Sequence, residues 1–397
     1  MHDHHALILT SVLIFIFGLV SKLSARSIFT APMFFVAVGI MISSFGLGLF
    51  HIKADTQMVK FLAELTLIII LFVDGSLLKL THLKDALSGI SGRLLLIGLP
   101  LTAILGSLFG ILIFPEWGVW SILLLALILS PTDAALGQAV VKSEVVPDEI
   151  KQGISIESGL NDGMVLPPIL ICIAALAQGG TALPNDQNWL QYIILQLTLG
   201  PIFGVIIGHF GGKAIDFACS NNWMESTFQR LSCLSLAILA FSFAEAVQGN
   251  GFIAAFVAGL TLSVNNRIVR DRIQEFGEAE GQLLSLFIFL IFGLVAVPAF
   301  ISYWDLSSIV YAILSLTVIR MLPVAICLMG FKVNMYSKLF IGWFGPRGIA
   351  SILYLLIVIG DIGTEGHEDV LSVIVLTVLI SIFAHGISAL PMTNKFR

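Results

Sequence analysis

Apolar runs of about twenty residues recur along almost the whole chain, and they constrain its fold more than any other feature. A helix that crosses a bilayer needs about 20 such residues. Hydrophobic residues make up 57% of the 397 positions and charged residues only 11%, whereas soluble domains carry roughly 25% charged residues. The runs therefore predict an all-α polytopic membrane protein.

Thirteen runs are candidates for transmembrane helices. They cover residues 6–22, 28–49, 58–79, 91–114, 118–141, 152–178, 190–212, 229–248, 250–264, 281–301, 306–330, 337–360 and 369–391. The eighth and ninth meet at "QGNG", so a single long helix there is an alternative. Only a few residues follow the last run, and we expect no appended soluble domain.

Lysine and arginine are distributed very unevenly between the two sides of this arrangement. If the N-terminus lies outside, all but four of the 20 fall in cytoplasmic loops or in the C-terminus. The exceptions are Lys53 and Lys60 in outer loops and Arg320 and Arg347 within spans. Cytoplasmic loops of membrane proteins carry this excess. It predicts an outer N-terminus and a cytoplasmic C-terminus, in what we expect to be a bacterial inner (plasma) membrane.

Six acidic residues lie within the predicted spans, where a charge costs roughly 2.5–3.5 kcal/mol on insertion scales. They are Glu64, Asp74, Asp133, Glu157, Asp162 and Glu245. Acids at such depth are paired or functional. We interpret Glu64 and Glu245 as interfacial and give Asp74 no central role. The other three cluster with helix-breaking residues, and there we expect the chemistry.

The fifth span is interrupted by "SPTD", residues 130–133. Pro131 removes a helical hydrogen bond near mid-span. Unwound backbone at membrane depth is tolerated where it lines a cavity or is buried in protein, and broken helices mark the ion sites of transporters. The alternative is a plain proline kink in which a neighbour satisfies Asp133.

The sixth span carries "ESGLNDG". Helical periodicity places Glu157 and Asn161 on one stripe and Ser158 and Asp162 on the next. The second stripe offers oxygen ligands, which a hard monovalent cation requires.

Two arginines are buried in later spans. Glu157 needs compensation, and we predict an ion pair with Arg320. We expect Arg347, at the break "GPR", to line a route or to cap broken-helix carbonyls. Simple bracing is the alternative for both arginines.

The interrupted spans five and twelve are separated by seven spans, an odd offset that inverts their orientation. This predicts inverted-topology repeats, with spans one to six matching spans eight to thirteen and span seven as connector. The two discontinuous helices would cross at mid-membrane, where Asp133 and Asp162 complete a cation site.

The motifs "SPTDAA", "ESGLNDG" and "GPRGIAS", with the span count and order, resemble the sodium/proton antiporters of the monovalent cation/proton antiporter superfamily, in the NhaP/NHE branch. The resemblance implies that Asp162 binds the cation and the proton. Asp133, Ser158 and Thr132 would complete the Na⁺ shell. Asn161 would mark an electroneutral branch. Glu157 and Arg320 would be the family's buried ion pair, with Arg347 as a further supporting residue.

The resemblance also implies a homodimer with two kinds of domain. Residues 1–90 and 179–301 would form the dimer domain (spans one to three and seven to ten). Residues 91–178 and 302–397 would form a moving core (spans four to six and eleven to thirteen).

We therefore expect a transporter rather than an enzyme, with no cofactor and no nucleic-acid partner. It would exchange Na⁺ or Li⁺ for H⁺ one for one, by alternating access, through a single carboxylate. The alternatives are K⁺/H⁺ exchange on the same fold, an ion channel, and an intramembrane aspartyl protease that uses Asp133 and Asp162.

Overall fold

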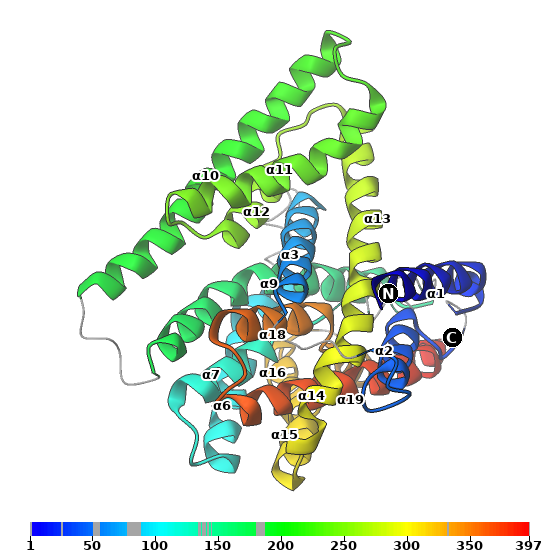
Figure 1. Ribbon diagram of the computed structural model, residues 1–397, viewed down its shortest axis with the longest axis vertical. Coiled ribbons are helices and arrows are strands. Elements are labelled where there is room, and N and C mark those ends of the chain that lie inside the picture. The colour runs from blue at the N-terminus through cyan, green and yellow to red at the C-terminus, as the bar shows by residue number, and fades with distance from the viewer. Residues whose placement is uncertain are drawn as a thin grey trace.

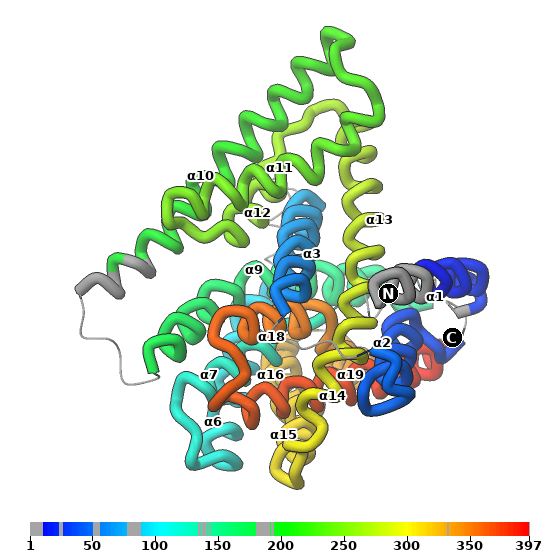
Figure 2. The backbone as a smooth tube through the Cα atoms, viewed as in Figure 1, coloured from blue at the N-terminus to red at the C-terminus, as the bar shows by residue number. Residues whose placement is uncertain are grey.

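The computed structural model describes residues 2–24, 27–50, 56–77, 89–133, 136, 140, 143, 145–179, 187–331 and 333–396. Within these ranges every regular element is a helix (Figures 1 and 2). The all-α prediction is confirmed for this part of the chain.

Helices occupy each of the thirteen predicted ranges. They are α1 (His2–Ser24), α2 (Ala31–Ile42), α3 (Gln57–Leu77), α5 (Ile90–Arg93), η1 (Leu94–Gly98), α6 (Leu99–Ile113), α7 (Val119–Ile128), α9 (Asp148–Ala177), α10 (Gln187–Ser220), α11 (Ser226–Ala246), α12 (Gly251–Leu260), α13 (Arg267–Ile291), η2 (Phe292–Ala296), α14 (Val297–Phe300), η3 (Ile301–Tyr303), α15 (Leu306–Leu316), α16 (Val318–Cys327), α17 (Met335–Trp343), α18 (Ile349–Ile362), α19 (Glu368–Thr393) and η4 (Asn394–Phe396). Among the described residues, seven helical stretches are long and apolar enough to cross a membrane.

Several predicted boundaries differ from the structure; for example, α2 ends at Ile42 rather than at residue 49, and α10 extends to Ser220 rather than to residue 212. Helix α13 begins at Arg267 rather than at residue 281, because its charged first half is amphipathic and hydropathy alone does not detect it. Its buried positions Val269, Ile273 and Gly277 are spaced by four and form one stripe. The single long helix across "QGNG" is wrong, because α11 and α12 are separate and Asn250 caps the second.

Two π-helical turns, which the sequence analysis missed, widen otherwise α-helical spans. Segment η1 runs directly into Leu99–Pro100, and η2 into Val297–Pro298. Proline has no N–H to donate to the preceding turn. A widened turn before the ring is one way to accommodate the missing hydrogen bond, as π-bulges within helices do.

Helices α10, α11 and α12 pack on one another in the upper part of Figure 1, and α13 descends from them past α3. Helices α6, α7, α15 and α19 pack together in the lower part. Helices α9 and α18 contact both α7 and α3, so they lie between the two groups.

Glycines allow the tightest helix crossing in the upper group. A Cβ on Gly259 of α12 would overlap the Phe72 carbonyl of α3, and one on Gly75 of α3 would overlap the Phe256 carbonyl of α12. Such close backbone approach is typical of small residues at membrane helix interfaces. Helix α3 also packs on α9 and α18, the helices that lie between the two groups.

Candidate functional site

Two interruptions of the helical chain lie side by side at the centre of the candidate site. Helix α7 ends at Ile128, and residues 131–133 are not helical. Residues 344–348 separate α17 from α18 in the same way. The main-chain N–H of Asp133 donates to the Pro346 carbonyl (2.9 Å), and the Ile349 N–H donates to Asp133 Oδ2 (2.8 Å). The chain therefore unwinds at residues 131–133 instead of kinking, although a neighbour does satisfy Asp133.

The first turn of α18 is built to receive this carboxylate. Asp133 accepts a hydrogen bond at the N-terminus of a 14-residue helix, where the exposed N–H groups and the helix dipole favour negative charge. Gly348 precedes that helix, and a Cβ at this position would overlap the Asp133 carboxylate. Ser351 Oγ donates to the Ile128 carbonyl (2.7 Å), which the end of α7 leaves without a helical partner.

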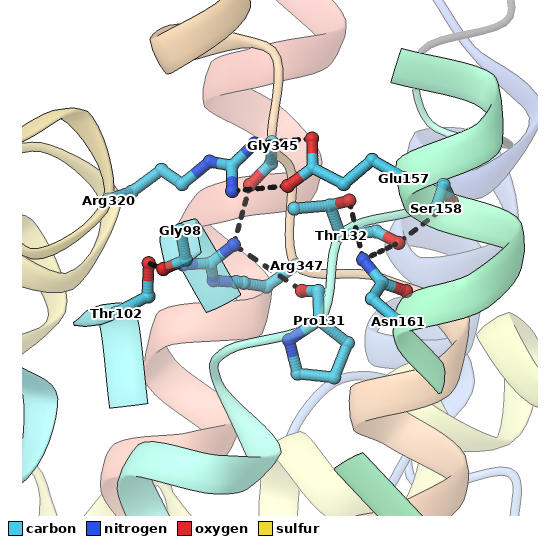
Figure 3. A network of polar contacts seen from close by, with 10 residues as sticks. All are labelled: Gly98, Thr102, Pro131, Thr132, Glu157, Ser158, Asn161, Arg320, Gly345 and Arg347. Carbon is cyan, nitrogen blue, oxygen red and sulfur yellow. Dashed lines mark hydrogen bonds and ion pairs between the residues drawn. The ribbon is translucent and has the colours of Figure 1, made fainter. Parts of the chain in front are cut away.

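Arg347 links the two breaks (Figure 3). Its side chain is fully buried, and Nη1 donates to the carbonyls of Gly345 (2.8 Å) and Pro131 (3.3 Å). Of the two functions expected for this arginine, the capping of broken-helix carbonyls matches these contacts.

The predicted ion pair between Glu157 of α9 and Arg320 of α16 is confirmed. Two parallel hydrogen bonds of 2.6 and 2.8 Å join the guanidinium to the carboxylate, and each side chain is 1% exposed. Gly345 lies so close to this guanidinium that a Cβ there would overlap it (Figure 3). The pair therefore also packs against the second break.

Helix α9 holds the end of the first break through two further side chains. Ser158 Oγ donates to the Thr132 carbonyl (2.8 Å), and Asn161 Nδ2 donates to Thr132 Oγ1 (2.8 Å). Periodicity placed Asn161 on the stripe of Glu157, yet its amide reaches the same residue as Ser158 (Figure 3). Residues 158 and 161 are three apart, and side chains at that spacing are neighbours on a helix.

Asp162 differs from the other two carboxylates of the cluster. It is buried, and its Oδ1 has no hydrogen-bond partner among the described residues. Tyr354 of α18 donates to the main-chain carbonyl of Asp162 (2.8 Å) and not to the carboxylate. Asp74 and Asp133 are the charged groups near enough to influence it. A buried carboxylate without compensation is neutralised by a proton or by a bound cation.

Ser158 and Asn161 therefore contact Thr132 directly, and Asp133 contacts the first turn of α18. Asp162 lies one turn along α9 from Ser158. No hydrogen bond joins Asp162 to Asp133 in the described part of the chain. In that part there is also no group of three or more His, Cys, Asp or Glu side chains suited to a metal ion.

Sequence reasoning missed several polar side chains around the site. They are Ser351, Tyr354, Ser381 and His385, all buried. Each is an isolated polar residue in an apolar run, as in "SILYLLIVI" and "SIFAHGIS". An isolated polar residue at membrane depth is a usable signal, because its hydrogen bonds must be met inside the protein.

Glu64 and Glu245, interpreted as interfacial, line a cavity of about 490 Å³. The cavity also borders the second half of α9 beyond Pro167, and it contains an ion pair between Lys60 and Asp361 (2.6 Å). That pair joins α3 to the end of α18. Both side chains are about one-third exposed.

Two relatives of this chain in sequence are both named as cation/proton antiporters. The chain is 27% identical over 355 residues to the K⁺/H⁺ antiporter NhaP of Alkalimonas amylolytica, which covers 88% of this chain and 60% of that protein. It is 26% identical over 258 residues to the Na⁺/H⁺ antiporter 2 of Zygosaccharomyces rouxii, covering 62% and 32% respectively. The chain thus spans between about one-third and three-fifths of the length of these relatives.

The fold is also that of a solved structure. The sodium proton antiporter MjNhaP1 from Methanocaldococcus jannaschii at pH 8 superposes with a TM-score of 0.77, at 20% identity, over 96% of this chain and 97% of that one. The family model described as "Sodium/hydrogen exchanger, transmembrane" matches residues 9–395. The chain therefore belongs to the sodium/hydrogen exchanger family, within the monovalent cation/proton antiporter superfamily.

Proposed function

We propose that this protein exchanges a monovalent cation for H⁺ across a membrane, with the Asp162 carboxylate as the site that both ions share. The observation that carries the proposal is the contrast among the three buried acids. Glu157 is compensated by Arg320, and Asp133 by the first turn of α18. Asp162 Oδ1 has no such partner, so it needs either a proton or a cation at all times.

The cation would bind beside Asp162 through oxygen atoms alone. Asp133, Ser158 and the main chain of Thr132 supply these oxygens, and a hydroxyl that donates to one neighbour can still offer its oxygen to a cation. Because the crossing holds these groups in place before the ion arrives, little reorganisation is needed on binding.

One-for-one exchange follows from the count of groups that can change charge. Asn161 is neutral, and the charge of Glu157 is cancelled by Arg320 in a pair that solvent does not reach. Only Asp162 then alternates between a proton and a cation, so the binding of Na⁺ in place of H⁺ moves no net charge.

The chain organisation that accompanies this function is also a proposal. It comprises thirteen crossings in two inverted repeats, an outer N-terminus, a bacterial inner-membrane location and a homodimer. Residues 1–90 and 179–301 would form the dimer domain, and residues 91–178 and 302–397 the core that moves against it. The packing of α10 to α13 on one side, and of α6, α7, α15 and α19 on the other, supports this division.

Na⁺ or Li⁺ is the proposed cation and K⁺ the alternative, since one relative is named as a K⁺/H⁺ antiporter and the other as a Na⁺/H⁺ antiporter. The protease alternative loses support from the geometry. Its two aspartates would share a water, whereas Asp133 is engaged by the Ile349 N–H.

The test is exchange by the purified protein in proteoliposomes. An imposed pH gradient is collapsed by adding Na⁺, Li⁺ or K⁺ in turn, and internal pH is read with a dye. We expect cation-dependent collapse by the natural protein and by Asp271→Asn, an exposed control. Asp162→Asn should abolish it. Exchange retained in Asp162→Asn refutes the proposal, and a response of the initial rate to an imposed membrane potential refutes the one-for-one ratio.

A further inference from the structure

The second break removes several helical hydrogen bonds, and one of them would join Arg347 to Trp343. If α17 continued without interruption, the Arg347 N–H would donate to the Trp343 carbonyl four residues earlier. In the structure the chain leaves the helix at residue 344. The Trp343 carbonyl accepts from the Gly345 N–H instead (2.8 Å), and the Arg347 N–H, which is buried, needs another partner.

Helix α19 provides a side-chain partner for each of these two groups, from residues one turn apart. The Arg347 N–H donates to Ser381 Oγ (2.7 Å), and His385 Nε2 lies 2.9 Å from the Trp343 carbonyl. Ser381 Oγ and His385 Nδ1 are 3.1 Å apart. Ser381 and His385 are both buried. Three close polar contacts in series therefore link the two ends of the break through α19.

Each ring nitrogen of His385 faces a main-chain carbonyl, Nε2 that of Trp343 (2.9 Å) and Nδ1 that of Ser381 (2.9 Å). The Trp343 carbonyl only accepts, so His385 Nε2 carries the hydrogen. The Ser381 hydroxyl accepts from the Arg347 N–H, and its oxygen lies 3.1 Å from Nδ1. Arg347 and Arg320 are the charged groups that act on this ring, and a third cation beside them would be costly.

The first break is held in an analogous way. There, α9 contributes Ser158 and Asn161, which bond Thr132. In each case a long helix later in the chain contributes two polar side chains, three or four residues apart. The first pair belongs to the proposed ion site, whereas the hydrogen bonds of the pair on α19 go to main chain and to its own helix, and the His385 ring packs against that of Trp343.

We propose that Ser381 and His385 are positioning residues that hold the two ends of the second break at a fixed separation. This keeps the Arg347 side chain directed at the Pro131 carbonyl and the Ile349 N–H directed at Asp133. They bind no ion themselves. They act by fixing the backbone on which the crossing, and with it the cation shell, is built.

The direct test is hydrogen–deuterium exchange of the purified protein, read in peptides that contain residues 344–349. His385→Leu and Ser381→Ala should each raise the exchange rate of this segment about tenfold, which corresponds to the loss of one buried hydrogen bond. His385→Gln keeps a donor and an acceptor and should stay within about threefold of the natural protein. Thr377→Ala is the matched control, because its buried hydroxyl bonds only its own helix.

A second readout rests on the proposed exchange function. His385→Leu should raise the apparent KM for the cation about tenfold, and His385→Gln should restore it, whereas Thr377→Ala should leave it unchanged. Deuterium exchange of residues 344–349 that is as slow in His385→Leu as in Thr377→Ala overturns the inference. It is also overturned if His385→Gln exchanges deuterium as fast as His385→Leu. The deuterium measurement needs no transport, so it decides this point even if the protein exchanges no cation. If His385→Leu does not fold, Ser381→Ala, which removes a single hydroxyl, decides it.

Discussion

Removing either member of the Glu157–Arg320 pair should destabilise the protein, and the two removals should differ. Loss of one partner from a buried pair costs about 3–5 kcal/mol, because the remaining charge is uncompensated. Two arginines, Arg320 and Arg347, lie close enough to Glu157 to interact with its charge. Glu157→Gln leaves both arginines unbalanced, whereas Arg320→Gln leaves Arg347 to balance Glu157. We therefore expect Glu157→Gln at the upper end of this range and Arg320→Gln at or below the lower end.

Thermal unfolding in detergent measures this difference. With about 2–4 °C per kcal/mol in domains of 150–250 residues, Glu157→Gln should lower Tm by on the order of 10 °C and Arg320→Gln by clearly less. The double substitution should recover much of the loss, since two neutral amides can bond each other. If Arg320→Gln is as unstable as Glu157→Gln, Arg347 does not compensate the charge of Glu157. If the losses in Tm add up in the double variant, Glu157 and Arg320 do not stabilise each other.

Two further substitutions test the crossing and a helix end. Gly348→Ala should destabilise the protein by about 1–3 kcal/mol in the same assay, because the new methyl group displaces the Asp133 carboxylate; an unchanged Tm would contradict the tight crossing. Asp305→Ala removes the N-cap of α15 and should cost about 1 kcal/mol at neutral pH. Hydrogen bonds from the Ser308 hydroxyl and N–H lower the pKa of Asp305, so its stabilisation is present above the ordinary pKa and disappears as pH falls through the lowered one. A cost that persists at acid pH would contradict this.

The sequence was sufficient to locate the helices and the two breaks, because apolar length and proline act locally. It also predicted the Glu157–Arg320 pair, because an unpaired charge buried in the bundle is costly and the two side chains carry opposite charges. It was insufficient for the first half of α13, where Arg267 and the acids after it lower the hydropathy while Val269 and Ile273 still pack inward. Periodicity recognises such a stripe, but hydropathy does not.

The details of the site depend on contacts between distant segments. That Asp133 would be engaged by the Ile349 N–H follows only once α7 and α18 are known to cross. The functions of Ser381 and His385 depend in the same way on where α19 passes the second break. Helical stripes predicted which faces were polar. They did not predict that Asn161 would join Ser158 on Thr132, because side-chain reach decides that contact.

The central claim is that one carboxylate, Asp162, holds either the cation or the proton. Calorimetric titration of the purified protein with Na⁺ tests it most directly, in buffers of different ionisation enthalpy at a pH where exchange is active. The difference between buffers gives the number of protons released for each cation bound. The account predicts a maximum of one proton per cation for the natural protein and for Asp271→Asn, and no coupled release for Asp162→Asn. Proton release that persists in Asp162→Asn, or cation binding that releases no proton in the natural protein at any active pH, would contradict it.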